Sequence, residues 1–350
     1  MHIPDGYLSP STCAALYAAS APFWAVAVRK MRSVLSTRFV PMVSLFAAFS
    51  FVIMMFNVPL PGGTTGHAAG VAIAAIVLGP WLGMLAVSIA LAIQALFFGD
   101  GGILALGANS FNIAIAGSLV ASVVYRVIAG ASAISSRRRV LAAGIAGYAA
   151  MNVAALLTAV QFGIQPALFQ DALGAPLYAP YPLSIAVPAM MIGHLTIAGL
   201  AEGLVTAAIL AWLQKSEPSL LGMETSSPAR GWQLTRRAWG WMAILLLITP
   251  LGLLTAGSAW GSWSPDDFRD PATRQEIEAG SLGADLPAGV PAGIERFSML
   301  WTAPVSDYAP GFMRSEAFGY ILSAMFGIGL IIATTMLLRR LAGTAEPATD

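Results

Sequence analysis

Long runs of apolar residues, separated by short polar segments, dominate the sequence. They cover about 12–28, 39–57, 67–98, 105–128, 140–163, 183–213, 239–258 and 318–338. Runs of about 20 residues are long enough to cross the ~30 Å hydrocarbon core of a membrane as helices. The alternating segments of about ten residues that build outer-membrane barrels do not occur in the sequence. The pattern predicts an all-α, polytopic membrane helix bundle.

The run at 67–98 is long enough for two short crossings and has Gly79-Pro80-Trp81 at its middle. Proline disfavours helix at the preceding residue and removes a helical hydrogen bond. We therefore interpret this region as a hairpin with arms at 64–79 and 82–98. Each arm has only about 16–17 residues, at or below the usual spanning length. With this hairpin the chain crosses the membrane nine times.

Basic residues orient these spans, because Lys and Arg in short loops resist translocation across the membrane. With nine spans, 14 of the 18 Lys and Arg fall on one side, which we assign to the cytoplasm. The N-terminus is then outside and the C-terminus inside. The segment 259–317 holds the other four basic residues together with nine acidic ones, and we predict that it forms an acidic external loop.

The polarity of the chain divides it into parts. The segment 214–236 is polar, lacks apolar periodicity and contains Pro218 and Pro228, which is typical of a linker. We predict about seven spans in 1–213, a cytoplasmic linker at 214–236, and two spans that flank the external loop in 237–350.

Composition excludes several other classes of protein. Of the 350 residues, 57% are hydrophobic and only 10% are charged, whereas soluble domains have roughly a quarter of charged residues. The single cysteine, Cys13, excludes a disulfide framework and a cysteine-rich metal cluster. The formal net charge of +1 says nothing about nucleic acid, since the placement of the charges matters more than their sum, and we expect no nucleic-acid partner. The first ten residues lack the basic residues of a secretory signal, so we expect them to belong to the mature protein.

The N-terminus carries the most distinctive chemistry. A free amine at Met1, the amide nitrogen of His2 and Nδ1 of its ring can chelate one metal ion through a five-membered and a six-membered ring. These nitrogens lie nearly in a plane, and a further imidazole would complete a square, which suits Ni(II) or Cu(II) better than Zn(II). The alternative interpretation is a chance histidine on a frayed terminus.

His67 is the candidate for the fourth ligand. It follows the residues PGGTTG at a predicted external junction, on the same side of the membrane as Met1. Glycines at this junction permit close backbone approach, so the terminus could pack against it. The alternative is a histidine satisfied by other partners at the membrane interface.

Polar residues in the spans could orient or gate such a site; the candidates are Asn109, Asn112, His194 and Glu202. An ionised glutamate inside a membrane costs about 2.5–3.5 kcal/mol on insertion scales, so we expect Glu202 to face protein and to have a partner. Hydrogen bonding between helices is the structural alternative for these residues. The sequence has no P-loop, HExxH or GxSxG motif, so we expect a binding and conducting protein whose ATPases are separate chains, not an enzyme.

Five segments, in this order, resemble the CbiM/NikM family: MHIPDGYLSP, FNVPLPGGTTGHAAG, LGPW, IQALFFGDGGILALGANSFN and HLTIAGLAEGLVTA. This family comprises the substrate-specific components of nickel and cobalt energy-coupling-factor (ECF) transporters, which belong to the ABC class. The resemblance implies that Met1, His2 and His67 hold the metal, that Ni²⁺ or Co²⁺ is the transported ligand with no other cofactor, and that the MHIPDG start slightly favours nickel.

The resemblance also implies partners and a location. The partners are a CbiQ/NikQ-like transmembrane coupling component and two CbiO/NikO-like ATP-binding subunits, and the location is the bacterial cytoplasmic (inner) membrane. SWSPDDF, APVSDY and the last span resemble the small CbiN/NikN component, whose external loop usually reads PDGLE, although Asp267 and Phe268 replace the usual Gly-Leu. This implies a fusion of two components, and it leaves open whether the loop contacts the metal site.

Two other functions compete with this interpretation. A secondary divalent-metal transporter without partners would need buried acidic residues in several spans, and only Glu202 clearly qualifies. An enzyme with a catalytic metal would need an open coordination position and a general base, and a square of four nitrogens leaves little room for them.

Overall fold

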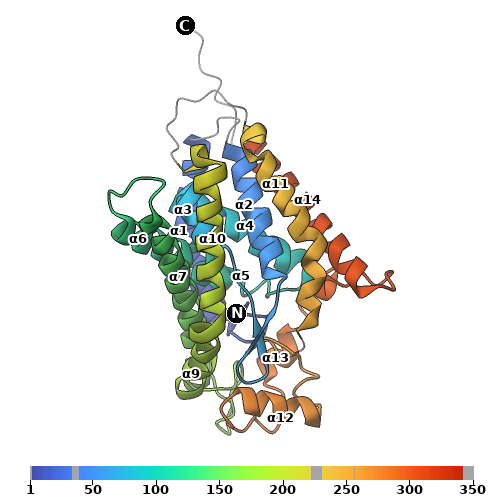
Figure 1. Cartoon of the computed structure of the whole chain (residues 1–350). Coiled ribbons are helices and arrows are strands. Elements are labelled where there is room, and N and C mark those ends of the chain that lie inside the picture. Colours follow the sequence, from blue (N-terminus) through green and yellow to red (C-terminus); the bar gives the residue numbers. More distant parts are fainter. Residues whose placement is uncertain (1, 34–38, 222–230, 256, 342–350) are drawn as a thin grey trace.

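The computed structural model describes residues 2–33, 39–221, 231–255 and 257–341, which form a bundle of helices (Figure 1). Seven helical stretches in these residues are long and apolar enough to span a membrane on their own. They are Pro10–Arg32, Pro80–Phe98, Leu106–Ala129, Arg137–Leu168, Leu183–Ser216, Thr235–Leu254 and Glu316–Arg340. Each coincides with one of the nine predicted spans, and the prediction of a polytopic helical membrane protein is confirmed.

The elements of the first half are α1 (Pro10–Ser33), α2 (Phe39–Met54), β1 (Val58–Leu60), β2 (Thr64–Gly66), α3 (Val71–Leu78), α4 (Pro80–Ile93), the π-helical turn η1 (Gln94–Phe98), α5 (Leu106–Asn109), the π-helical segment η2 (Ser110–Ala116), α6 (Gly117–Ala129) and α7 (Arg137–Gly163). Those of the second half are α8 (Gln165–Leu168), α9 (Leu183–Gly193), the π-helical turn η3 (His194–Ala198), α10 (Gly199–Ser216), η4 (Pro218–Leu220), α11 (Gly231–Ile248), η5 (Thr249–Leu254), α12 (Pro271–Gly280), α13 (Ala292–Phe297), η6 (Ser306–Tyr308) and α14 (Glu316–Leu341).

The predicted hairpin is present, but its first arm is not a complete helix. The helix breaks at Gly79, between α3 and α4, and the two arms pack so closely that a Cβ atom on Gly83 would lie 2.7 Å from the Cα of Ala75. However, α3 has only 8 residues, a length of about 12 Å, and cannot cross the membrane alone. The remainder of the arm, from residue 64, is extended or irregular because it forms a strand and a loop. The short arm is almost wholly buried among other helices.

The strands β1 and β2 form a small antiparallel hairpin in which Val58 pairs with Gly66 and Leu60 with Thr64. The turn between them contains Gly62 and Gly63, both at positive φ, a conformation that other residues adopt only with strain. This hairpin ends directly before His67.

The exposed apolar side chains lie on the helices that would contact lipid. Large hydrophobic residues are more than half exposed on α6, α7, α10, α11 and α14: Val127, Leu141, Leu204, Leu247 and Leu337. A lipid-facing helix surface has this character, since a hydrocarbon environment does not penalise exposed leucine. Helices α11 and α14 pack side by side against α2, so the C-terminal spans extend the bundle rather than forming a separate one (Figure 1).

The segment 259–317 folds against the N-terminal part of the chain. Its helices α12 and α13 lie at the lower end of Figure 1, beyond the β hairpin. The hydroxyl of Tyr7 donates to the carbonyl of Trp263 at 2.8 Å, and Thr65 in the hairpin forms an isolated β-bridge with Ala259. A Cβ atom on Gly6 would lie only 2.6 Å from the carbonyl oxygen of Gly293. The segment is therefore packed tightly onto the N-terminal segment and the hairpin.

The orientation in the membrane is a prediction that cysteine labelling tests. In a Cys13→Ala background, a cysteine in place of the exposed Ala288 should react with a membrane-impermeant thiol reagent in intact cells, because the segment 259–317 is expected outside. A cysteine in place of the exposed Ala131, between α6 and α7, should react only after permeabilisation. The opposite pattern would reverse the predicted orientation, and labelling of both sites in intact cells would mean a miscounted span.

Candidate metal site

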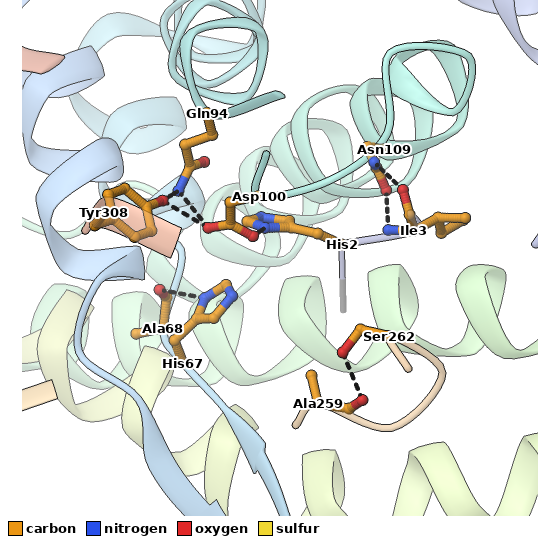
Figure 2. Close-up of polar contacts among 10 residues, drawn as sticks. All are labelled: His2, Ile3, His67, Ala68, Gln94, Asp100, Asn109, Ala259, Ser262 and Tyr308. Carbon is orange, nitrogen blue, oxygen red and sulfur yellow. Dashed lines mark hydrogen bonds and ion pairs between the residues drawn. The ribbon is translucent and has the colours of Figure 1, made fainter. Parts of the chain in front are cut away.

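The N-terminal segment is held in place beside α5. Ile3 N–H donates to the side-chain oxygen of Asn109 at 2.7 Å, and the amide nitrogen of the same side chain donates to the Ile3 carbonyl at 3.0 Å. Gly102 N–H donates to this carbonyl as well, at 2.8 Å. The main chain directly after His2 is therefore fixed by Gly102 and by Asn109, and Figure 2 shows the two hydrogen bonds to Asn109.

Asp5 also links the N-terminal segment to the loop directly before α5. Its carboxylate accepts hydrogen bonds from the N–H groups of Ile103, Leu104 and Ala105, at 3.0, 2.8 and 3.3 Å. Burial raises the pKa of Asp5, and these three donors partly offset that rise. A Cβ atom on Gly102 would lie 2.0 Å from the carboxylate. A glycine at position 102 is therefore needed for Asp5 to approach.

His67 is presented by the β hairpin. It directly follows Gly66, and its Nδ1 donates to the carbonyl of Ala68 at 3.1 Å. Burial, followed by the positive charge of neighbouring groups, lowers the pKa of His67 well below its usual value. The ring is therefore neutral, with the lone pair on Nε2, the form that a metal ion requires.

Glu202, on α10, holds the chain just beyond His67. Its carboxylate accepts hydrogen bonds from the N–H groups of Ala69, Gly70 and Ala72, at 2.7, 2.9 and 3.2 Å. These N–H groups lie at the N-terminus of helix α3, where unpaired N–H groups and the helix dipole both favour an anion. The expectation that Glu202 faces protein and has a partner is confirmed. Together, the hairpin and Glu202 fix the backbone on both sides of His67.

The rings of His2 and His67 lie next to each other, with their centroids 5.0 Å apart and their planes at 49°. Both residues are buried, with 7% of their surface exposed. Nδ1 of His2 contacts a carboxylate oxygen of Asp100 (Figure 2), and its Nε2 is buried without a partner in the described part of the chain. The predicted chelate uses Nδ1 of His2, so binding in that mode requires the ring to turn away from Asp100.

The Asp100 carboxylate has two further partners. Its other oxygen accepts hydrogen bonds from the hydroxyl of Tyr308 at 2.7 Å and from the side-chain amide of Gln94 at 3.1 Å. Although burial acts to raise the pKa of Asp100, its contact with His2 and the hydrogen bond from Tyr308 hold that pKa below its usual value. The site therefore contains a fixed negative charge in contact with His2.

A cavity of about 390 Å³ lies beside these groups, and it is lined by both parts of the chain. Its lining includes His2, His67, Asp100, Asp307, Tyr308 and Tyr320. Among the described residues, no group of three or more His, Cys, Asp or Glu side chains could hold a metal ion. That main-chain nitrogens join the two imidazoles as ligands stays a prediction of the sequence. Met1, which would supply the amine, lies outside the described residues.

The structure does not bring Asn112 or His194 into contact with these histidines. Asn112 exchanges hydrogen bonds with Gln161 on α7, at 2.8 and 2.7 Å. His194 is buried, and its Nδ1 donates to the carbonyl of Met190 at 2.8 Å, one turn earlier in the same helix. Both sets of contacts fit the structural alternative of hydrogen bonding within and between helices.

Asp100, Gln94 and Tyr308 were not among the site residues predicted from the sequence. A signal was present for all three: Gln94 and Asp100 lie in the segment IQALFFGDGGILALGANSFN, and Tyr308 ends APVSDY. A carboxylate within a glycine-rich loop is a reasonable candidate for a site near a metal. The contact between residues 208 positions apart, however, has no sequence signature.

The chain matches a known protein family and several curated relatives. Residues 2–220 match the family model CbiM, described as the cobalt uptake substrate-specific transmembrane region. The chain is 55% identical over 333 residues to the fused nickel transport protein NikMN of Rhodobacter capsulatus, and the match covers 95% of both chains. It is 39% identical to a probable fused nickel transport protein, LarMN, of Lactiplantibacillus plantarum, with 94% of both chains covered.

A solved structure is similar to more than half of the chain. A crystal structure of a transition metal transporter is 50% identical in sequence, with a TM-score of 0.58, and the match covers 61% of this chain and 93% of that one. The family model covers more than half of the chain, and the fused relatives extend over almost all of it. This multi-pass membrane protein therefore belongs to the CbiM family, with the CbiM/NikM part fused to an N-component-like C-terminal part.

Proposed function

We propose that the chain is the substrate-binding membrane subunit of an ATP-driven Ni²⁺/Co²⁺ uptake transporter, with nickel slightly favoured. The main support is the pair of buried imidazoles, 5.0 Å apart, beside a polar cavity next to the N-terminus. The relatives are named as nickel and cobalt transport proteins, which agrees with the expectation of a transporter and not an enzyme.

The proposed ligands are the amine of Met1, the amide nitrogen and Nδ1 of His2, and Nε2 of His67. The neutral His67 ring, whose Nδ1 is bonded to the Ala68 carbonyl, presents the correct nitrogen. His2 would turn about its Cβ–Cγ bond, so that Nδ1 leaves Asp100 and faces the metal. Four nitrogens in a square favour Ni(II) over metals that prefer a tetrahedron.

Two of the predicted supporting residues have contacts that suit this role. Asn109 fixes the main chain at Ile3, directly after His2, and Glu202 fixes the chain directly after His67. Groups that orient the ligands of a metal typically change its affinity by about 10–100-fold when they are removed. We propose that both residues position the metal ligands, whereas the contacts of Asn112 and His194 favour a structural role.

The transporter would need other chains for energy. The 350 residues contain no P-loop motif, so we propose a CbiQ/NikQ-like coupling component and two CbiO/NikO-like ATP-binding subunits as partners in the cytoplasmic membrane. In this proposal residues 1–213 bind the metal, 214–236 form the cytoplasmic linker, and 237–350 supply the external segment.

Metal binding and uptake together test this function. Purified full-length protein should bind close to one Ni²⁺ or Co²⁺ per chain in equilibrium dialysis, and nickel uptake by cells should require the ATP-binding subunits. Binding without any dependence of uptake on those subunits would favour the secondary transporter. Failure to bind either metal would overturn the proposal.

Replacing Glu202 by glutamine should weaken both the fold and the metal site. The glutamine side chain has only one acceptor oxygen, and its NH₂ group would face the N–H donors at the N-terminus of α3. Hydrogen bonds to charged groups contribute about 1.5–3 kcal/mol each, so the thermal stability in detergent should fall measurably, together with nickel affinity. The control is Thr206→Val on the same helix, which removes a buried hydroxyl without a partner in the described residues. Equal behaviour of the two variants would contradict a role for Glu202.

A further inference from the structure

A groove of about 890 Å³ runs along the bundle between α7 and α10. The two helices lie side by side (Figure 1), and at the floor of the groove a Cβ atom on Gly203 would lie only 2.8 Å from the carbonyl oxygen of Gly144. Most of the lining is apolar, and four lining side chains are 41–71% exposed: Leu141, Ile145, Leu200 and Leu204. The groove therefore opens to the surroundings of the bundle, which in a membrane are lipid.

One end of the groove is polar and positively charged. Arg137 at the start of α7 and Lys215 in the last turn of α10 both line it, and neither forms a hydrogen bond or ion pair in the part of the chain that the structure describes. The side-chain amide of Gln214 donates to the carbonyls of Ile134 and Ser136 at 2.7 and 3.1 Å. Because Gln214 adjoins Lys215 and Ser136 adjoins Arg137, these bonds bring the two cations to the same end of the groove.

The two arginines that follow Arg137 are already bonded within the protein. Nε of Arg138 donates to the carbonyl of Ile128 at 2.5 Å, and Nε of Arg139 donates to the carbonyl of Ser132 at 2.9 Å. Both hold the loop between α6 and α7, and neither lines the groove. In this run of three arginines, the guanidinium group that stays available for an outside partner is that of Arg137, and its planar fork matches the oxygen atoms of a phosphate.

The length of the groove corresponds to one leaflet of a membrane. Its lining residues reach from Arg137 to Tyr148 on α7 and from Lys215 to Leu200 on α10, which is ~16 Å and ~22 Å of helix rise. One leaflet of a bilayer, with its headgroups, is about 20–22 Å thick. A helix that crosses the membrane would need a contact surface through both leaflets, whereas a single phospholipid fits a groove of this length.

We propose that the groove between α7 and α10 binds one anionic phospholipid, with its phosphate at Arg137 and Lys215 and an acyl chain along the apolar part. This inference does not depend on the proposed metal site. Lysine and arginine at a membrane surface attract anionic headgroups, and basic pockets between membrane helices bind them. A lipid in this position contacts both helices and stabilises their packing, since a ligand that binds the folded state favours it.

Native mass spectrometry of the purified full-length protein with added phosphatidylglycerol tests this site. The wild type should retain one tightly bound phosphatidylglycerol and should bind phosphatidylcholine with the same acyl chains more weakly. Each cation near a membrane surface contributes about fivefold to the affinity for anionic lipid. A variant with Arg137→Gln and Lys215→Gln should therefore bind phosphatidylglycerol about 30-fold more weakly, and wild-type affinity in this variant would overturn the inference.

The matched control removes the same charge elsewhere. It combines Arg126→Gln and Arg138→Gln, which replace two exposed arginines that do not line the groove. Its affinity for phosphatidylglycerol should stay close to that of the wild type. An equal loss in both double variants would show that the lipid follows the overall charge of the surface and not the groove, which would refute the proposed site.

A variant that fills the groove tests the place of the acyl chain. Ala211→Phe puts a ring into the apolar part and keeps both cations, so it should bind phosphatidylglycerol at least tenfold more weakly. Phosphatidylglycerol should also raise the thermal stability in detergent of the wild type more than that of Ala211→Phe. Inorganic phosphate, which has no acyl chain, should not raise it. Wild-type lipid affinity in Ala211→Phe, or equal stabilisation by inorganic phosphate, would contradict the inference.

A helix of a partner protein is the other occupant that could cover the groove. Leu204 lines the groove with 71% of its surface exposed. In a Cys13→Ala background, a cysteine in place of Leu204 should not cross-link to another membrane protein in cells that contain the assembled transporter. Cross-linking at this position would show that a protein helix occupies the groove, and the lipid site would then be wrong.

Discussion

Replacing His67 by alanine is expected to weaken Ni²⁺ binding by more than about 100-fold, beyond the range typical of groups that only orient ligands. His67 is proposed to supply one of four nitrogens, and a square-planar site that loses one of them becomes both weaker and less selective. The residue lies at the end of the β hairpin and is followed by the segment that Glu202 holds, so the surrounding fold should persist. Equilibrium dialysis with purified protein measures the change.

His194→Ala is the control for this experiment, because His194 is equally buried but bonds to the Met190 carbonyl within its own helix. We expect a smaller effect on Ni²⁺ binding than for His67→Ala. The reverse order would move the metal site to the helix that contains His194. Thermal stability should be measured for both variants, since removal of any buried side chain leaves a cavity.

The hydrophobic pattern predicted the helices well because membrane spans must satisfy their own backbone and be apolar over a fixed length. The break at Gly79-Pro80 was also predictable, since the proline effect is local. The prediction that 64–79 forms a helical arm was wrong over its first half. There the chain forms a strand and a loop, with Gly70 at positive φ, and tertiary packing determines that conformation.

The pairing of His2 with His67 was predictable, because it follows from coordination chemistry and from the predicted location of both residues on the same side of the membrane. The residues that surround this pair were not predictable from the sequence. Asp100 and Tyr308 are 208 residues apart and meet only through the packing of the C-terminal part onto the first. Whether the external segment contacts the candidate metal site was left open by the sequence, and in the structure Tyr308 lines the same cavity as both histidines.

Adding residues before Met1 is expected to abolish high-affinity binding of nickel and cobalt while leaving the fold intact. The proposed chelate needs a primary amine at Met1, which any extension converts to an amide, and a retained formyl group would have the same effect. In the extended protein the nitrogen of Met1 belongs to an amide, and this nitrogen is a poorer ligand than a free amine because its lone pair is delocalised. The three-nitrogen chelate of Met1 and His2 would lose one of its two rings.

A cleavable extension makes this test specific. The tagged protein should show the thermal stability of the metal-free native protein but little Ni²⁺ binding, and a protease that regenerates Met1 as the first residue should restore full affinity. An extension after Asp350 is the matched control and should not change binding. Unchanged nickel affinity in the N-terminally extended protein would refute the amine as a ligand, even if His67→Ala still abolished binding. That combination would point to Nε2 of His2, which is buried and has no partner among the described residues, as the atom that binds the metal together with His67.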